Sequence, residues 1–362
     1  MMNWRQRFLS ALSCEQPDHV PVWEMYMNGS SIIGVHQLLT GDTAVTSDRQ
    51  DLTGQEGEAV TDMYCDIIEQ LDMDGACFGV GQGLVPESAN TARDKFGTLQ
   101  ELSDLGEPYP LEGPIKDESD LVGFDMASKL DEDDFAQTIQ AMERIGPERA
   151  HVVSMPEPFK ISWRLRGGME QLLIDYVTNP RLVHGMSRVG TDYCLAVVEM
   201  SAKLGADTVV LPGDLAGEEN LIMSPKHYRE YIKPYQAEIV AHAHKHGLKA
   251  IKHSDGNMWP ILDDLTEIGF DGFHPVQPQC MDIGEVKRHL TGKACVLGNI
   301  DCRDLLVFGT EEDVERTVRE TIDVAAPGGG YILVSSNSIH PSVKPENFAA
   351  MVEAAHKYGT YA

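Results

Sequence analysis

Short apolar runs alternate with longer stretches of helical periodicity along most of the chain. Most of the runs lack a clean polar–apolar alternation, which is typical of parallel strands covered by helices. We identify eight predicted strands, at approximately 20–24, 73–79, 150–156, 206–212, 248–253, 270–276, 294–300 and 330–336. Eight strands, each followed by a helix, predict an α/β protein with the (β/α)8 architecture of a TIM barrel. A doubly wound open sheet with a second domain is the alternative.

Residues with defined preferences for helix ends mark two of the predicted helices. Ser224 is a suitable N-cap, Pro225 suits the first helical position, and Gly247 suits the end, so one helix is expected between them. The last helix is expected to begin near Pro345 and to end near Gly359.

The whole chain, residues 1–362, is predicted to form one domain. Two segments of it lie outside the repeating strand–helix pattern. Residues 1–19 are expected to form an N-terminal helical extension, and residues 80–149 a long insertion between the second and third strands. The part from 101 to 134 contains twelve acidic residues and two lysines, and its first half is expected to be loop-like. We interpret the insertion as an acidic surface excursion, with a lid or a docking face for a partner as the alternative.

Charge and cysteine content narrow the choice of partners and compartment. The 362 residues carry a formal net charge of −28, which disfavours binding to nucleic acids and to anionic membranes. We find no apolar run of the roughly 20 residues that a membrane helix needs, and the N-terminal stretch lacks the features of a signal peptide. Seven cysteines without a CxxC motif indicate a reduced, cytoplasmic protein without disulfides.

Polar side chains follow almost every predicted strand. Because TIM-barrel enzymes place their catalytic groups at the carboxyl ends of the strands, this pattern favours an enzyme. The expected catalytic residues are His253, His274, Glu157 and Glu24, and the expected substrate contacts are Trp23, Met25, Gln277 and Asn337. The expected metal ligands are His253, Asp214, Asp255 and Glu219, a nitrogen and oxygen set that suits zinc. A hydrogen-bonding, acid–base or structural role for His253 stays open.

Three further histidines occur in the run AHAHKHG, at the end of a predicted helix. His242 and His246 share a helix face and have the spacing of a metal-binding pair. We interpret all three, including His244, as solvated residues that interact favourably with the negative end of the helix dipole.

Several long runs resemble the uroporphyrinogen decarboxylase superfamily. These runs are RQRFLSALSCEQPDHVPVW, GDLAGEENLIMSP, GLKAIKHSDGNMWPILDDLTEIGFDGFHPVQP, GNIDCRDLL and GGGYILVSSNSIHPSVKPENFAAMVEAAHKYG. The resemblance covers nearly the whole chain except much of 80–149, and it implies a (β/α)8 barrel. It also implies one of two activities: decarboxylation of uroporphyrinogen without a cofactor, or methyl transfer to or from a corrinoid-bearing protein, with zinc in the methyltransferase.

The sequence departs from both patterns that this resemblance implies. The decarboxylase resemblance implies an Arg-rich stretch after the first strand that binds the carboxylates of the substrate. This chain has no Arg or Lys from Pro21 to Gly34. In the members that transfer methyl groups to thiols, the resemblance implies a His-x-Cys motif on the fifth strand and a further Cys after the eighth strand. This chain has His253-Ser254-Asp255 and Ser336-Asn337-Ser338 at the corresponding places. A site without thiolates is better suited to an oxygen-bearing substrate.

We therefore expect an O-demethylase, in which a methyl ether such as a methoxylated aromatic passes its methyl group to a separate corrinoid protein. In this interpretation zinc at His253 polarises the ether oxygen, or His274 or Glu157 protonates it. The alternatives are a lyase that acts on a small carboxylic acid and a corrinoid methyltransferase that uses methanol, methylamine or a thiol. A homodimer stays open.

Overall fold

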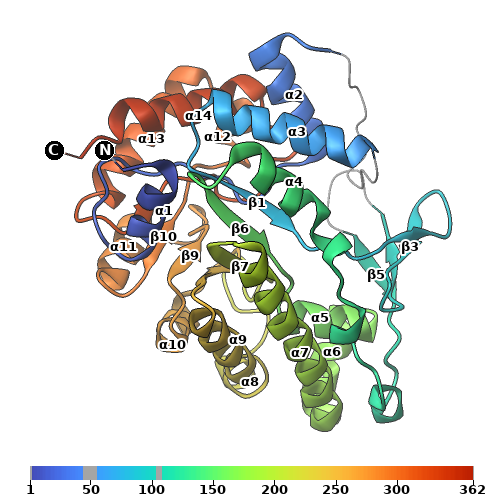
Figure 1. The fold of residues 1–362 in the computed structure, drawn as a ribbon. Coiled ribbons are helices and arrows are strands. Elements are labelled where there is room, and N and C mark those ends of the chain that lie inside the picture. Colours follow the sequence, from blue (N-terminus) through green and yellow to red (C-terminus); the bar gives the residue numbers. More distant parts are fainter. Residues whose placement is uncertain (1, 44–54, 103–107, 362) are drawn as a thin grey trace.

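Seven parallel strands form one curled sheet in the computed structural model, which describes residues 2–43, 55–102 and 108–361 (Figure 1). In spatial order they are β1 (Gly75–Gly79), β6 (Ala150–Ser154), β7 (Thr208–Pro212), β8 (Lys249–His253), β9 (Gly272–His274), β10 (Cys295–Leu297) and β11 (Tyr331–Ile332). Each lies within one of the predicted strands. The spatial order follows the chain order without a reversal, unlike in the alternative doubly wound sheet.

The first predicted strand, 20–24, is not a regular strand. Its backbone nevertheless bonds to both edges of the sheet: the N–H of Trp23 donates to Leu333 at 3.1 Å, and the carbonyl of Val22 accepts from the N–H of Asp74 at 2.8 Å. The prediction of a strand fails here because Pro21 has no N–H and interrupts the ladder. The segment still connects the edge beside β1 to the edge beside β11.

The α-helices lie mainly on the outer, convex side of this sheet (Figure 1). Besides α1, which is described below, they are α2 (Gly29–Thr40), α3 (Gln55–Gln70), α4 (Ala136–Ile145), α5 (Pro158–Arg166), α6 (Met169–Thr178), α7 (Pro180–Leu204), α8 (Pro225–Tyr231), α9 (Lys233–Lys245), α10 (Leu262–Ile268), α11 (Ile283–Leu290), α12 (Leu305–Phe308), α13 (Glu311–Ala325) and α14 (Pro345–Tyr358). Within the described ranges, none of the helices combines the length and apolar character that a membrane span requires.

The helix predicted after β7 is divided into α8 and α9. Its predicted start is confirmed, because the side chain of Ser224 accepts the backbone N–H of His227 at 3.1 Å. The division follows from Pro234 near the start of α9, since proline lacks the N–H for an internal helical bond and its ring clashes with the preceding turn. The last helix, α14, begins and ends as predicted.

Helix α1 (Trp4–Leu12) fills one end of the curled sheet. Its residues Phe8, Ala11 and Leu12 belong to the same buried cluster as Trp23 and inward-facing strand residues. The strand members of that cluster are Cys77, Ala150, Val152, Val210, Ile251, Cys295, Leu297 and Ile332. The backbone N–H of Arg5 donates to Glu148 just before β6, which places the helix at the amino-terminal end of the strands.

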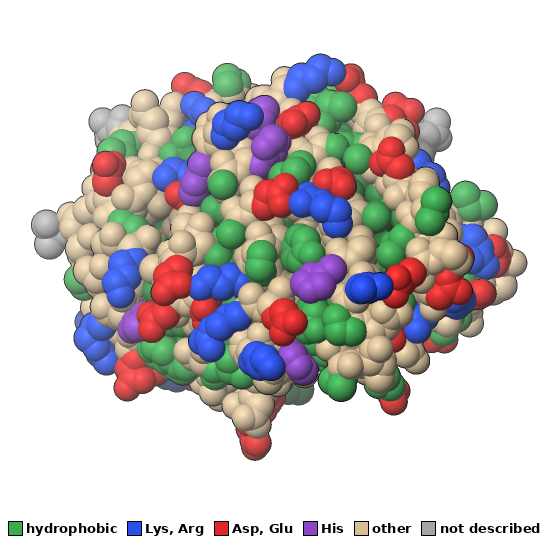
Figure 2. Space-filling model, turned by 90° about the horizontal axis from the view of Figure 1, so that it is seen from below, with side chains coloured by type: hydrophobic (Ala, Val, Ile, Leu, Met, Phe, Trp, Pro, Cys, Tyr) green, Lys and Arg blue, Asp and Glu red, His purple; other side chains and the backbone are tan. Residues whose placement is uncertain are grey.

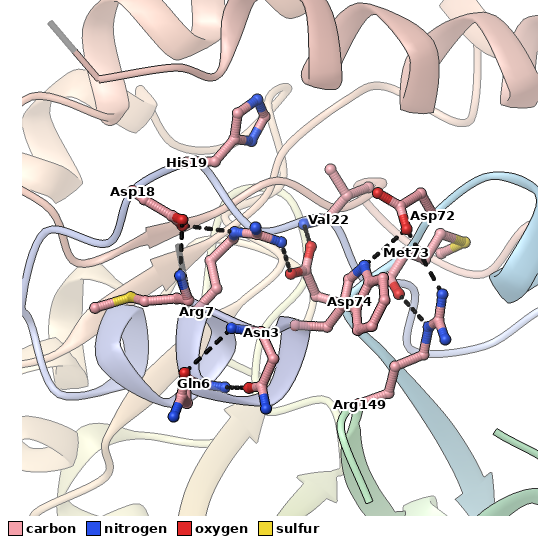
Figure 3. Close-up of polar contacts among 12 residues, drawn as sticks. Asn3, Gln6, Arg7, Asp18, His19, Val22, Asp72, Met73, Asp74 and Arg149 are labelled. Atoms are coloured by element: carbon pink, nitrogen blue, oxygen red, sulfur yellow. Dashed lines mark hydrogen bonds and ion pairs between the residues drawn. The ribbon is translucent and has the colours of Figure 1, made fainter. Parts of the chain in front are cut away.

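Partly buried ion pairs fix α1 at this end (Figure 3). Arg7 reaches Asp74 with an N–O distance of 2.8 Å and Asp18 at 3.0 Å, and Asp74 also accepts the backbone N–H of Val22 at 2.7 Å. Burial raises the pKa of Asp74 to about 6, although Arg7 opposes that shift. The same carboxylate therefore holds both α1 and the irregular first segment.

Residues 85–112 contain a small antiparallel sheet, whose last strands fall partly in the segment from 101 onward that was predicted to be loop-like. Its strands are β2 (Val85–Pro86), β3 (Thr91–Arg93), β4 (Leu99–Glu101) and β5 (Tyr109–Glu112), and residues 103–107 lie outside the described residues. Three short 3-10 helices follow, at Glu118–Leu121, Ala127–Lys129 and Glu132–Phe135. The next helix, α4, packs on α3, β1 and β6 and so belongs to the outer helical layer. The insertion, predicted as 80–149, therefore ends before α4.

The surface charge is mixed on the face shown in Figure 2, which views the molecule from below relative to Figure 1. Acidic and basic side chains are interspersed there, with histidines among them. The large negative net charge is therefore not gathered on this face.

Candidate functional site

A cavity of about 530 Å³ lies at the carboxyl ends of β1, β6, β7 and β8. Its volume falls within the range of small-molecule sites. Its polar lining residues include Gln82, Ser154, Lys160, Arg164, Asp214, His253, Asp255, Asn337 and Ser338, and its apolar lining includes Met25, Trp163 and Met169. The predicted end of the fold therefore holds a cavity with both ionisable and apolar walls.

Three of the four predicted metal ligands come together at this cavity. Asp214 follows β7, His253 ends β8, and Asp255 comes two residues later; one ligand atom from each lies within 4.8 Å of the others. His253 Nε2 is 3.7 Å from Asp214 Oδ1, which also accepts the N–H of Asp255 at 3.0 Å. Asn337 donates to Asp255 Oδ2, while Oδ1 is buried with no hydrogen-bond partner in the described part of the chain.

The ionised form of Asp255 in this cluster is unfavourable unless a positive charge lies beside it. Burial, and then the charge of Asp214, raises the pKa of Asp255 to about 8. Burial, with smaller effects from Lys252 and Lys160, lowers the pKa of His253 to about 3, so its imidazole is neutral at neutral pH. Neutral imidazole and carboxylate are the forms that ligate zinc, and three such ligands with an open position suit a catalytic zinc site. The residues present therefore fit a zinc ion.

His274 and Glu157 do not line the cavity. His274 is buried beside His253, with 2.7 Å between their Nδ1 atoms, and burial holds its pKa well below the usual range. Glu157 is also fully buried, 3.0 Å from Lys252 Nζ, and Gln236 donates to its other oxygen. Burial raises the pKa of Glu157 and lowers that of Lys252, and their mutual attraction opposes both shifts. These positions suit residues that hold the strand ends in place.

The other expected site residues divide between the cavity and its supports. Met25 and Asn337 line the cavity, whereas Trp23 is packed in the interior cluster, 5.8 Å from Phe8 between ring centroids. Gln277 accepts the backbone N–H of Gly256 at 2.9 Å and is not part of the lining.

Glu219 does not join the metal cluster. It is exposed in the loop beyond Asp214, and the cluster contains Asp214, His253 and Asp255 without it. Four residues separate it from Asp214; Leu215 and Ala216 are buried, and Glu219 lies in the exposed stretch that follows them.

Glu24 lies in the irregular first segment, residues 20–24, and does not line the cavity. Its carboxyl group is fully buried and accepts the backbone N–H groups of Met25 at 3.0 Å and Ser335 at 3.3 Å. Burial raises its pKa to about 8, which those hydrogen bonds only partly oppose. Glu24 thus ties the first segment to the chain that follows β11.

Replacing Glu24 with glutamine should change the pH dependence of stability. The folded-state pKa is about 8, above the unfolded value of about 4.3, so wild-type stability is lost as pH rises toward 8. The variant lacks this titration. Its unfolding free energy relative to wild type should therefore rise by about 1.4 kcal/mol per pH unit in this window. Urea unfolding at about pH 5.5 and about pH 7.5 measures this, and a difference that does not vary with pH would refute it.

Two basic side chains line the cavity that the sequence analysis did not predict. Lys160 and Arg164 lie one turn apart on α5, are only 8% and 7% exposed, and line the cavity; Arg164 also donates to Gln82 at 3.0 Å. Helix α5 begins at Pro158, four residues after β6, so its first turns face the strand ends. That short connection was the one feature of the sequence that could have indicated that Lys160 and Arg164 lie near the cavity. The lack of basic residues in 21–34 does not leave the cavity without cations.

Asp255 stands where a His-x-Cys pattern would have its cysteine, and serines lie beside it and in the segment after β11. Ser254 accepts the backbone N–H of Leu215 at 2.9 Å and so joins the loops after β7 and β8. Ser336 accepts the backbone N–H of Cys302 at 3.2 Å. All seven cysteines are free, and none belongs to the Asp214–His253–Asp255 cluster. The cluster offers only nitrogen and oxygen ligands.

The curled parallel sheet, its outer helices and the cavity at the strand ends define a TIM-barrel-like α/β protein. A family model described as "Uroporphyrinogen decarboxylase (URO-D)" matches residues 3–358. The chain therefore belongs to the uroporphyrinogen decarboxylase family.

Relatives with two different names resemble this chain. It is 21% identical to uroporphyrinogen decarboxylase from Idiomarina loihiensis over 97% of this chain and 95% of that protein. It is 26% identical to the methylcobamide:CoM methyltransferase MtbA from Methanosarcina acetivorans over 60% of each. Among solved structures, a methyltransferase from Methanosarcina mazei superposes with a TM-score of 0.76 at 18% identity, covering 99% of both chains. This last similarity establishes the shared fold.

Proposed function

We propose that this protein is the methyltransferase component of a corrinoid-dependent O-demethylase system that works in the cytoplasm. It would move a methyl group from a methyl ether, expected to be a methoxylated aromatic, to the cobalt of a separate corrinoid protein. The observation that carries this proposal is the sulfur-free cluster of Asp214, His253 and Asp255 at the cavity. The relatives named MtbA support methyl transfer within the family.

The cavity has suitable walls for a methoxylated ring. Met25, Trp163 and Met169 provide apolar and aromatic surface, while the ionisable cluster lies on the side of β7 and β8. An aromatic ring between these walls would place its ether oxygen toward Asp214, His253 and Asp255. This arrangement separates binding of the ring from activation of the ether.

His253, Asp214 and Asp255 would hold a zinc ion, which when bound supplies Lewis acidity toward the ether oxygen. The chain's own residues prepare this position. His274 contacts Nδ1 of His253 and so orients the ring with Nε2 toward Asp214. Asn337 holds one oxygen of Asp255, which leaves Oδ1 as the available atom.

The oxygen that loses its methyl group keeps the electron pair of the broken C–O bond and must gain a positive partner. Of the predicted proton donors, His274 and Glu157 lie behind the cavity surface, so we assign them positioning roles. Asp214 and Asp255 both line the cavity, and a zinc ion held there with His253 would supply that positive charge.

The decisive experiment measures methyl transfer directly. The purified protein is incubated with 2-methoxyphenol and free cob(I)alamin as the acceptor. We expect methylcobalamin, followed by its absorbance, and demethylated phenol in equal amounts. A control without protein sets the background. Formation of neither product with a panel of methoxylated aromatics would contradict the proposed donor class.

A lyase acting on a small carboxylic acid is the second candidate. Lys160 and Arg164 favour it, because one buried ammonium and one buried guanidinium group at the cavity could bind the carboxylate of such a substrate. Such an enzyme would release carbon dioxide without any corrinoid. Measuring carbon dioxide release in the absence of cobalamin separates the two candidates.

A further inference from the structure

A second cluster of potential metal ligands lies between two outer helices. Glu199 comes from α7, and His242 and His246 come from α9 and the residue that follows it. One ligand atom from each lies within 4.8 Å of the others. His242 Nε2 is 3.1 Å from Glu199 Oε1, and the two imidazole rings have centroids 4.6 Å apart. Two helices that pack together thus present one cluster.

The chemistry of these three groups suits a divalent transition metal. Two imidazoles and one carboxylate form a donor set found in zinc sites, and the fourth position would be left to water. Two histidines four residues apart on a helix lie on one face, so they chelate without a change in the backbone. The side chains are half-buried or exposed, which lets them adjust to the shorter separation that ligands of one ion require.

The neighbouring histidine has a different partner. His244 Nε2 is 2.8 Å from Asp271 Oδ2, on the side of the helix toward β9. The run AHAHKHG therefore contains two histidines that converge with Glu199 and one that does not. This contrast makes His244 a matched control on the same helix.

We propose that Glu199, His242 and His246 form a zinc-class metal site that cross-links α7 to α9. The helices end here just before β7 and β8 begin, so the site lies at the amino-terminal end of the strands, away from the cavity. The bound ion acts on stability, because it joins two helices that are about 40 residues apart in the sequence. This inference does not depend on the proposed function.

The test compares zinc uptake and melting temperature in four proteins. These are the wild type, His246→Ala, Glu199→Gln and the control His244→Ala, each dialysed against Zn²⁺ and analysed for bound metal. We expect His246→Ala and Glu199→Gln to bind one zinc fewer per chain and to lose the zinc-dependent rise in melting temperature. His244→Ala should retain both.

The same four proteins are also prepared with His253→Ala, so that zinc at the cavity does not enter the count. In that background, His246→Ala and Glu199→Gln should again bind one zinc fewer per chain. This expectation holds whether or not the protein catalyses methyl transfer. Equal zinc uptake by wild type and His246→Ala, or an equal loss in His244→Ala, would overturn the proposal. Circular dichroism spectra check that each variant is folded.

Discussion

Replacing His253 with alanine is expected to abolish methyl transfer, with kcat/KM reduced by at least about 100-fold. His253 is the only nitrogen ligand in the Asp214–His253–Asp255 cluster, and its neutral imidazole faces Asp214 at the cavity. Without it, the two carboxylates cannot define a three-ligand zinc site. The measurement is the rate of methylcobalamin formation from a methoxylated aromatic, together with the zinc content of the variant.

The control for this prediction is His289→Ala. His289 is a partly exposed histidine on α11 that pairs with Asp263 at 2.8 Å and does not line the cavity. Its replacement should leave the rate unchanged. Retention of full activity by His253→Ala would remove the cluster from the mechanism, even if the protein proved to be a methyltransferase.

Replacing Lys252 with methionine is expected to destabilise the protein by about 3–5 kcal/mol. Lys252 and Glu157 are 1% and 0% exposed, with 3.0 Å between Lys252 Nζ and Glu157 Oε1. The ammonium also donates to the carbonyls of Leu211 and Gly213, at 3.2 and 2.8 Å. Its loss leaves a buried carboxylate without its cation. Urea unfolding at neutral pH measures the effect.

Two further variants show whether the unpaired charge is the cause. The double variant Glu157→Gln/Lys252→Met should recover much of the lost stability, because it removes both charges. Lys203→Met breaks an exposed pair with Glu132, whose side chains are 67% and 60% exposed, and should cost less than about 1 kcal/mol. A double variant as unstable as Lys252→Met would point instead to the lost carbonyl contacts.

The regular strands were predictable because each buried run is short, apolar and bounded by turn residues. The first strand was not, because the apolar pattern of residues 20–24 gives no measure of how Pro21 interrupts pairing. The small β2–β5 sheet was missed for a related reason. Its strands are two to four residues long, and prolines at 86 and 110 within them indicate loops.

The candidate site shows a similar division. Asp214, His253 and Asp255 were predictable because they follow strands, and parallel strands bring their carboxyl ends together. Lys160 and Arg164 were missed because they lie on a helix, where the sequence alone does not show which face turns inward. The buried state of Glu157 and Glu24 depends on contacts with distant residues such as Lys252 and Ser335, which no local pattern contains.

Helix α1 and the apolar cluster above it have a consequence for kinetics. They fill the amino-terminal end of the sheet, so in the described chain the cavity is approached from the side of the strands' carboxyl ends. If the methyl acceptor is a protein that docks on this side, it would cover the entrance that the small donor uses. Catalysis would then follow a compulsory order: the donor enters first, and the demethylated product departs only after the acceptor has moved away.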